Sequence, residues 1–308
     1  MSEEIVVLAL GGNAITTKSR TFDSQYRAIR VATKEIASLA KDGYKIVITH
    51  GNGPQVGDAL LRNECARDLV PPLPLYACVA GTQGVLGAMI QAALLDYLGS
   101  NFKIASLVTK VTVSAKDPAF KNPTKPIGSI FTKDMLRKIK KVEPSASFRE
   151  VLPGKYRRVV PSPDPISILE LNAVKELIED GYIVVACGGG GIPMINDNKI
   201  YFTEAVIDKD LTSEVLATGI GASVFVSLTN VEGAYVNFES KNRKLLRKIH
   251  LDKMKALLED GNFAEGNMEP KVRAAMRFAE NTGKNAVIAS LGKARKAVEL
   301  KSGTIIYK

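Results

Sequence analysis

The sequence predicts an α/β fold built on a mainly parallel sheet, and two patterns carry this prediction. Continuous apolar runs of five or six residues recur along the chain, and amphipathic patterns with helical spacing lie between them. Unbroken apolar runs suit strands that are buried on both faces. Strands that alternate with helices form parallel sheets through right-handed crossovers. With 308 residues, of which 45% are hydrophobic and 24% charged, the chain can bury a large core.

Five of the apolar runs are predicted strands, and the first three of them end in glycine clusters. We expect the strands at residues 5–10, 45–49, 182–187, 224–228 and 286–289. Helical spacing of apolar residues predicts helices over 29–40 and 171–178, each followed by a glycine that signals the helix end. In an open parallel sheet, ligands bind at the carboxyl ends of the strands. The glycine clusters therefore mark the expected site.

Cysteine and histidine usage excludes a disulfide framework and a zinc site. The three cysteines are scattered and none has C-x-x-C spacing, which predicts a reduced, cytoplasmic protein without structural metal. Acidic residues at the N-terminus replace the basic ones of a signal peptide. Residues 77–95 carry no charge and could span a membrane by length. Their polar members Thr82, Gln83 and Gln91 favour a buried helix instead, so no membrane contact is expected.

The alternation of strands and helices breaks down between about residues 116 and 165. Eight prolines interrupt this segment, and residues 133–158 hold nine Lys or Arg against three acidic residues. We interpret the segment as an insertion that leaves the sheet, with a long surface linker as the alternative. The basic stretch lacks interleaved aromatic residues, and the chain has no Trp, so nucleic-acid binding is not expected. A solvated face or an anionic small ligand accounts for the charge.

The glycine clusters and a few lysines predict a phosphate site. Glycine lets the backbone approach an anion closely, with N–H groups available to phosphate oxygens. No G-x-x-x-x-G-K-[ST] motif is present, so other cations must supply the charge. The candidates are Lys209, Lys271 near a helix start, and Lys125 between prolines. Taken alone, each lysine is more often a solvated surface charge, and Asp210 a helix cap. Among lysines, Asp210 could fix their geometry.

Several longer motifs resemble those of the carbamate kinases, which belong to the amino acid kinase family. The motifs are VVLALGGNAI (6–15), ITHGNGPQVG (48–57), KNPTKPIG (121–128), RRVVPSPDP (157–165), CGGGGIP (187–193), EAVIDKD (204–210) and NMEPKVRAA (267–275). The resemblance implies a three-layer αβα sandwich on an open, mainly parallel eight-stranded sheet. It also implies a homodimer, an N-terminal lobe over about 1–200, a protruding subdomain over about 116–165, and a C-terminal lobe over about 201–308.

The resemblance further implies the reaction ATP + carbamate ⇌ ADP + carbamoyl phosphate, with Mg²⁺ carried by the nucleotide and no metal site of the protein's own. The N-terminal lobe would bind carbamate or carbamoyl phosphate, and the C-terminal lobe ATP or ADP. Implied catalytic residues are Lys209, Lys271, Asp210 and Lys125. Implied substrate-binding residues are Gly11, Gly12, Asn13, Gly51, Asn52 and Gly53. Implied nucleotide-binding residues are Gly188, Gly189, Asp208, Asn230, Val231, Gly233 and Met268.

The chain departs from the family pattern in two places. Residues 148–157 read FREVLPGKYR where the family usually has an acidic-Ser-Gly-Arg-Gly-Trp run, and the region around 16–25 is divergent. Two other functions are weighed against the carbamate kinase reaction. One is phosphorylation of another small acid, such as N-acetylglutamate, and the other is a nucleotide-binding regulator without turnover. The insertion motif opposes the first, and the retained lysines and Asp210 oppose the second.

Overall fold

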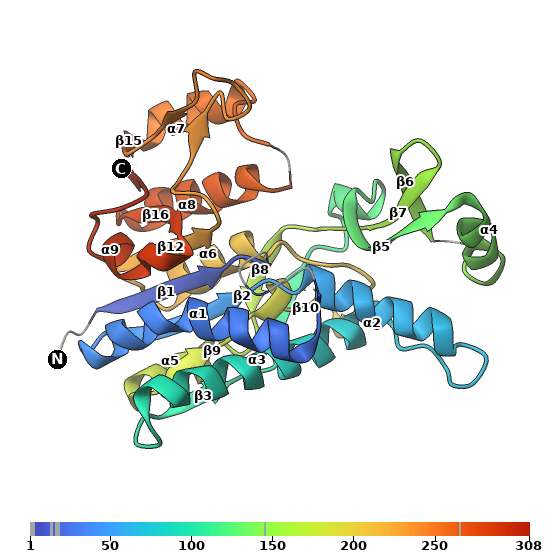
Figure 1. Ribbon diagram of the computed structural model, residues 1–308, viewed down its shortest axis with the longest axis horizontal. Coiled ribbons are helices and arrows are strands. Elements are labelled where there is room, and N and C mark those ends of the chain that lie inside the picture. The colour runs from blue at the N-terminus through green and yellow to red at the C-terminus, as the bar shows by residue number, and fades with distance from the viewer. Residues whose placement is uncertain (1–3, 13–14, 16–18, 145, 265) are drawn as a thin grey trace.

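A computed structural model describes residues 4–12, 15, 19–144, 146–264 and 266–308, and it is organised around one eight-stranded sheet (Figure 1). The strands, in spatial order, are β15 (Lys248–His250), β17 (Thr304–Tyr307), β16 (Ala286–Ser290), β12 (Val224–Thr229), β1 (Ile5–Leu10), β2 (Lys45–His50), β9 (Ile183–Val185) and β3 (Ile104–Ser106). Strands β16 and β17 pair antiparallel, and the other neighbours pair parallel. The predicted α/β class with a mainly parallel eight-stranded sheet is therefore confirmed.

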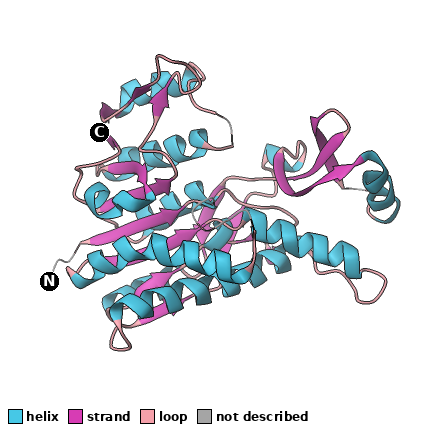
Figure 2. Cartoon of the chain, viewed as in Figure 1, coloured by secondary structure: helices cyan, strands magenta, loops and turns pink. Residues whose placement is uncertain are grey.

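Helices cover both faces of this sheet and give it three layers (Figure 2). Successive residues of β1 point to opposite faces, so Val6 and Leu8 pack in one core and Val7 and Ala9 in the other. The first core is closed by α1 (Phe22–Lys41), α3 (Leu75–Leu98) and α9 (Ala294–Val298). The second is closed by α5 (Leu171–Glu179), α6 (Lys209–Gly219), α7 (Leu251–Glu259) and α8 (Met268–Thr282). Burial on both faces explains why the strands read as continuous apolar runs.

The predicted strand at 182–187 is longer than β9, which covers Ile183–Val185. The reason lies in Cys187, which adopts a left-handed backbone conformation with φ of 54°. A single residue in that region turns the chain out of the sheet. The apolar sequence therefore continues past the end of the strand, into the short 3₁₀ turn η3 (Gly188–Gly190).

Helix α3 contains the uncharged stretch that was weighed as a membrane span. By length and composition it could cross a membrane, with a mean hydropathy of 1.5 over a window that is 56% buried inside the protein. Its polar side chains bond to other parts of the chain. Gln91 donates to the Ile104 carbonyl at 2.7 Å, and the Gln83 side chain bonds to Thr109. One side of α3 is buried against the main sheet, as expected of a core helix, and Val85 and Leu95 on its other side are exposed.

The segment that breaks the alternation folds into a small structure of its own. It contains η2 (Pro118–Phe120), β5 (Lys125–Thr132), α4 (Lys133–Val142), β6 (Ser147–Leu152) and β7 (Lys155–Val160). The three strands form an antiparallel sheet in the order β5-β7-β6, which projects beside the main body (Figure 1). The divergent residues 148–157 form the β6–β7 hairpin, with Gly154 at φ of 71° in its turn. The segment is therefore not an unstructured linker.

Two smaller sheets, one 3₁₀ turn and one more α-helix complete the described chain. A four-stranded sheet has the order β11 (Lys199–Phe202), β10 (Ile192–Asp197), β4 (Lys110–Val113) and β8 (Pro165–Ile168). A two-stranded sheet joins β13 (Tyr235–Val236) and β14 (Lys244–Leu245), and η4 (Leu291–Lys293) precedes α9. Helix α2 (Gly53–Ala66) follows β2 and carries the contact to the protruding sheet.

That contact is made by two glycines facing one another. A Cβ on Gly57 of α2 would lie 2.5 Å from the Cα of Gly128 in β5, closer than real Cβ atoms come to backbone. Gly128 itself has φ of 71°, a conformation that favours glycine. The paired strands β5 and β7 shift register between Ile127 and Ile130 at this point. The absence of a side chain at Gly57 thus lets the backbones of α2 and β5 touch, while glycine at position 128 allows the left-handed backbone of β5 there.

Gly57→Ala is expected to destabilise the protein, although alanine is the better helix former. Propensity alone would stabilise α2 by about 1 kcal/mol, but the added methyl must displace the backbone of β5. Overpacking of this kind costs about 1–3 kcal/mol. Thermal unfolding followed by circular dichroism measures the balance. If the midpoint temperature of unfolding of Gly57→Ala were higher than that of the parent protein, β5 could move away from the added methyl group without destabilising the fold.

Candidate active site

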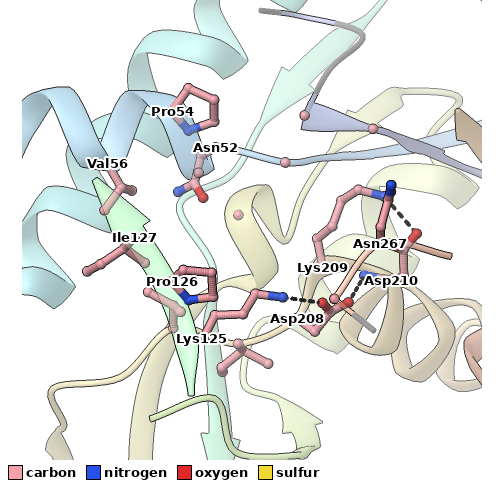
Figure 3. A pocket seen from close by; sticks show the side chains of 18 of the residues that line it. Asn52, Pro54, Val56, Lys125, Pro126, Ile127, Asp208, Lys209, Asp210 and Asn267 are labelled. Carbon is pink, nitrogen blue, oxygen red and sulfur yellow. Dashed lines mark hydrogen bonds and ion pairs between the residues drawn. The ribbon is translucent and has the colours of Figure 1, made fainter. Parts of the chain in front are cut away.

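A cleft of about 250 Å³ opens at the carboxyl ends of β1, β2 and β12, where the sequence places the site (Figure 3). Strand β5 of the protruding sheet forms its other wall. Twelve predicted residues line it: Gly11, Gly12, Gly51, Asn52, Gly53, Lys125, Gly189, Asp208, Lys209, Asp210, Asn230 and Lys271. Segments from both halves of the chain and from the insertion therefore meet in one cavity.

Asp210 is the centre of the polar cluster on the cleft floor. Its Oδ1 accepts hydrogen bonds from Lys209 Nζ at 2.7 Å and from the Ser227 hydroxyl at 2.7 Å, and its Oδ2 accepts from Lys271 Nζ at 2.9 Å. Asp210 and Lys271 are buried, with 4% and 6% of their surface exposed. The three charged side chains leave one positive charge in excess. A buried site with that excess attracts an anion.

The pKa values of this cluster follow from burial and from the shared carboxylate. Burial lowers the pKa of Lys209 to about 8, helped by the nearby Lys271 ammonium and opposed by Asp210. For Lys271, burial also acts to lower the pKa, but Asp210 more than offsets it and the pKa is raised. Burial acts to raise the pKa of Asp210, yet the two ammonium groups hold it well below its usual range. At neutral pH the carboxylate is ionised and both lysines are protonated.

Lys125 reaches the same cleft from β5 and pairs with a different carboxylate. Its Nζ lies 2.7 Å from Oδ2 of Asp208 (Figure 3). Asp208 is also the N-cap of α6, because its Oδ1 accepts the Asp210 N–H at 2.9 Å. The predicted nucleotide role of Asp208 thus has a structural alternative, since one carboxylate ties the insertion to the start of α6.

Hydrogen bonds between elements fix the helices that carry the two buried lysines. The Thr49 and Ser213 hydroxyls lie 2.6 Å apart and join β2 to α6, and Ser213 donates to the Lys209 carbonyl at 2.5 Å. Glu214 of α6 accepts from Asn281 of α8 at 3.2 Å. These bonds set the start of α6 relative to β2 and α8, and hence the positions of both ammonium groups.

The glycines after β1 and β2 allow close packing more than they offer free N–H groups. The Gly11 N–H donates to the Leu228 carbonyl at 3.1 Å, and the Gly51 N–H donates to the Leu10 carbonyl at 3.0 Å. A Cβ on Gly51 would lie 2.9 Å from the Gly12 amide nitrogen. The two amides are used within the sheet, so Gly11 and Gly51 bring the loops together and leave anion binding to neighbouring groups.

Helix α2 presents an uncapped N-terminus to this cleft. Asn52 is its N-cap residue, but its side-chain oxygen accepts no capping bond, and its Nδ2 donates to the Thr82 hydroxyl at 2.8 Å. Gly53 and Pro54 of the first turn line the cavity. The backbone N–H groups at a helix start carry partial positive charge and bind anions well. The HGNG loop therefore adds a second source of positive potential beside the lysine cluster.

The tetraglycine after β9 packs against two side chains of the HGNG loop, His50 and Asn52. A Cβ on Gly189 would lie 2.1 Å from the Asn52 side-chain nitrogen, and one on Gly188 would lie 2.4 Å from Nε2 of His50. His50 is buried, and burial lowers its pKa to about 4, so its ring is neutral at pH 7. Any side chain at these two positions would displace His50 or Asn52. The tetraglycine thus has a packing role that its sequence did not indicate.

Some predicted residues do not line the cleft. Gly188, Val231, Gly233 and Met268 lie outside its lining, and Gly233 packs against Thr304, whose hydroxyl oxygen a Cβ would approach to 2.5 Å. Asn13 falls outside the described residues. The lining of the cleft therefore does not support the nucleotide-binding roles predicted for Gly188, Val231, Gly233 and Met268. Contributors that sequence reasoning missed are Ser227, Thr82, Gly266 and Asn267, of which Gly266 and Asn267 line the cleft.

Comparison with known proteins gives a consistent result over nearly the whole chain. The sequence profile of the amino acid kinase family matches residues 4–290. Carbamate kinases of Thermococcus kodakarensis and Lentilactobacillus hilgardii are each 42% identical, over 98% of this chain and 99% and 97% of theirs. A solved structure of carbamate kinase from Giardia lamblia bound to AMP-PNP matches with a TM-score of 0.93 and 39% identity, covering 99% of this chain and 98% of that one. The resemblance seen in the sequence motifs is thereby confirmed. The chain belongs to the amino acid kinase family.

Proposed function

We propose that this protein is a carbamate kinase, which transfers a phosphoryl group reversibly between ATP and carbamate. The observation that carries the proposal is the buried Lys209–Asp210–Lys271 cluster, which lies in a cleft between glycine loops and Lys125 of β5. Phosphoryl transfer depends mainly on positioning and on stabilisation of negative charge. Full-length relatives named carbamate kinase, 42% identical to this chain, support the same reaction.

The chemistry is a direct in-line displacement. In one direction, a terminal oxygen of ADP attacks the phosphorus of carbamoyl phosphate. The new P–O bond completes ATP, the P–O bond to the carbamate oxygen breaks, and carbamate leaves with that electron pair. Carbamate is already an anion, so the reverse direction needs no general base. The Lys209 and Lys271 ammonium groups stabilise the charge on the transferring oxygens, and Asp210 orients both through its two oxygens.

The two ends of the cleft suit the two substrates. We assign carbamate to the side of Gly51, Asn52 and Gly53, where the uncapped start of α2 attracts a carboxylate. Asn230, after β12 on the opposite side, faces the nucleotide. Gly11 and Gly12 lie between them, where the phosphoryl group passes, and Lys125 reaches in from β5.

Mg²⁺ is proposed to enter as part of the nucleotide complex. The two carboxylates of the cleft, Asp208 and Asp210, are each paired with lysine, so neither offers a free ligand set. Among the residues that the structure describes, no group of three or more His, Cys, Asp or Glu could hold a metal. Magnesium prefers phosphate oxygens and water under such conditions. When bound, the ion would neutralise phosphate charge alongside the lysines.

We also propose that the enzyme is a cytoplasmic homodimer. Large apolar side chains are exposed near the α2–α3 connection and on α3, at Leu69, Val70, Leu73 and Val85. Leu73 and Val85 line one hollow of the surface together, and exposed apolar patches mark interaction sites on soluble proteins. Sedimentation equilibrium of the parent protein and of Leu73→Asp tests this. A parent protein that stays monomeric at micromolar concentration would contradict the dimer.

The function is tested by following ATP formation from ADP and carbamoyl phosphate in a coupled assay. Phosphorylation of N-acetylglutamate by ATP, run beside it, measures the rival kinase activity. We expect turnover of carbamoyl phosphate and none of N-acetylglutamate. Nucleotide binding without any ATP formation would instead indicate a regulator, and equal use of both acids would contradict the assigned specificity.

A further inference from the structure

Two arginines stand directly opposite one another on the hairpin of the protruding sheet. Arg149 of β6 pairs in register with Arg157 of the antiparallel strand β7. Side chains of directly paired residues project from the same face of a sheet, and like charges in that position destabilise it. Among the described residues, no carboxylate forms an ion pair with either guanidinium group. This arrangement has a cost unless an anion compensates it.

Three positive side chains near the pair already have a carboxylate partner. Arg158, next in sequence, forms a two-point ion pair with Glu143. Arg20 pairs with Asp58 at 2.8 Å, and Lys125 with Asp208 at 2.7 Å. The carboxylate of Glu150, the acidic residue beside Arg149, accepts the Gly154 N–H at 2.7 Å in the hairpin turn. Among the described cationic side chains that line the cavity beside the hairpin, Arg149 and Arg157 are therefore the two without a carboxylate partner.

This pair faces a groove that continues into the reaction cleft. Arg149 and Arg157 line a cavity of about 890 Å³ together with Arg20 from the main body, and Glu150 is the one acidic residue in its described lining. The groove shares Gly53, Lys125 and Asn267 with the cleft of the lysine cluster, so the two cavities are contiguous. An anion in the groove thus lies on a path to the buried ammonium groups.

Arg157 is held in place for such a role. Its Nη2 donates to the Gly128 carbonyl at 3.1 Å, while its buried Nε has no hydrogen-bond partner among the described residues. Gly128 is the residue of β5 that touches Gly57 of α2. The position of this guanidinium is therefore tied to the contact between the protruding sheet and the main body.

The geometry points to a phosphate-binding clamp, made by Arg149 and Arg157, at the entrance of the reaction cleft. Two adjacent guanidinium groups suit a doubly charged phosphate, which accepts several charge-assisted hydrogen bonds. The inference rests on the proposed function for its natural ligand, the phosphate of carbamoyl phosphate or of the nucleotide. Either ligand is captured by this pair before it reaches Lys209 and Lys271.

Arg149→Gln is the variant of choice, because Arg149 is exposed and no hydrogen bond of its side chain supports the fold. Lys138→Gln is the matched control: it removes one positive charge from an exposed position on α4, outside the groove. We expect Arg149→Gln to lower kcat/KM by ~5-fold for the substrate whose phosphate the clamp binds, either carbamoyl phosphate or ADP, and to leave kcat unchanged. The kcat/KM of the variant should also depend less on salt concentration than that of the parent protein. Arg149→Lys should restore part of the loss.

Measuring kcat/KM with each substrate varied in turn identifies which of the two supplies the phosphate that the clamp binds. A fall in kcat/KM confined to carbamoyl phosphate assigns the clamp to that ligand, and one confined to ADP assigns it to the nucleotide. Equal effects of Arg149→Gln and Lys138→Gln would overturn the clamp, since only general charge would then matter. Calorimetric titration with inorganic phosphate separates this question from turnover. Weaker phosphate binding by Arg149→Gln alone supports the clamp even if carbamoyl phosphate is not a substrate, whereas unchanged binding overturns it.

Discussion

Lys271→Met is expected to lower kcat by about 10²–10³-fold, the loss typical when one donor that stabilises transition-state charge is removed. Lys271 is 6% exposed and lies 2.9 Å from Asp210, so water cannot readily replace its ammonium group. Methionine keeps the length of the side chain and packs well in buried surroundings. Lys271→Met therefore removes the positive charge of the side chain while leaving its volume nearly unchanged. Steady-state rates of ATP formation at saturating substrate measure it.

A surface lysine provides the control for this experiment. Lys255 is exposed on α7, away from the cleft, and Lys255→Met removes the same charge from the chain. Its kcat should match that of the parent protein. If Lys271→Met also retained normal turnover, the buried cluster would not be the reaction centre and the proposed mechanism would fail.

Asp210→Asn is expected to impair both activity and stability. The amide keeps the shape of the carboxylate but leaves the ammonium groups of Lys209 and Lys271 without their shared counter-ion. Removal of one partner from a buried ion pair costs about 3–5 kcal/mol, because the remaining charge is left uncompensated. Thermal unfolding should therefore shift to lower temperature, and kcat should fall because the lysines lose their orientation.

The pH dependence of Asp210→Asn gives a separate test. Lys209 must be protonated to bind phosphate, and its pKa of about 8 places the alkaline fall of kcat/KM near pH 8 in the parent protein. Asp210 raises the pKa of Lys209, so its loss should move that fall to lower pH. A profile with its alkaline limb unchanged, or displaced to higher pH, would contradict the assignment of this limb to Lys209.

The central strands and their helices could be predicted from sequence because their signals are local. β1 and β2 are continuous apolar runs, and the structure buries them on both faces. The strands at the far edge could not be found in this way. β15 is three residues long and β17 four, and in both the buried positions alternate with exposed or partly exposed ones. Whether such short segments become strands depends on pairing with neighbouring strands, and the local sequence pattern holds no information on that pairing.

The site residues that could be predicted are charged residues that stand within a recognisable motif. Lys209, Asp210 and Lys271 stand at helix starts within long family motifs, and the structure brings them together. Ser227 gave no such signal, because it lies inside the apolar strand β12 and only the folded sheet turns its hydroxyl to Asp210. The packing role of Gly189 against Asn52 was equally hidden, since the two are far apart in sequence.

The position of β1 at the middle of the sheet has a consequence for biosynthesis. One edge of β1 pairs with β2 soon after it is made, but the other pairs with β12, at Val224–Thr229. At a translation rate of about 5–20 residues per second, that partner emerges roughly ten to forty seconds later. Until then an apolar strand keeps an open hydrogen-bonding edge, the usual starting point for aggregation. Ribosome-bound nascent chains from which Val224–Thr229 has not yet emerged should therefore depend on holding chaperones to stay soluble.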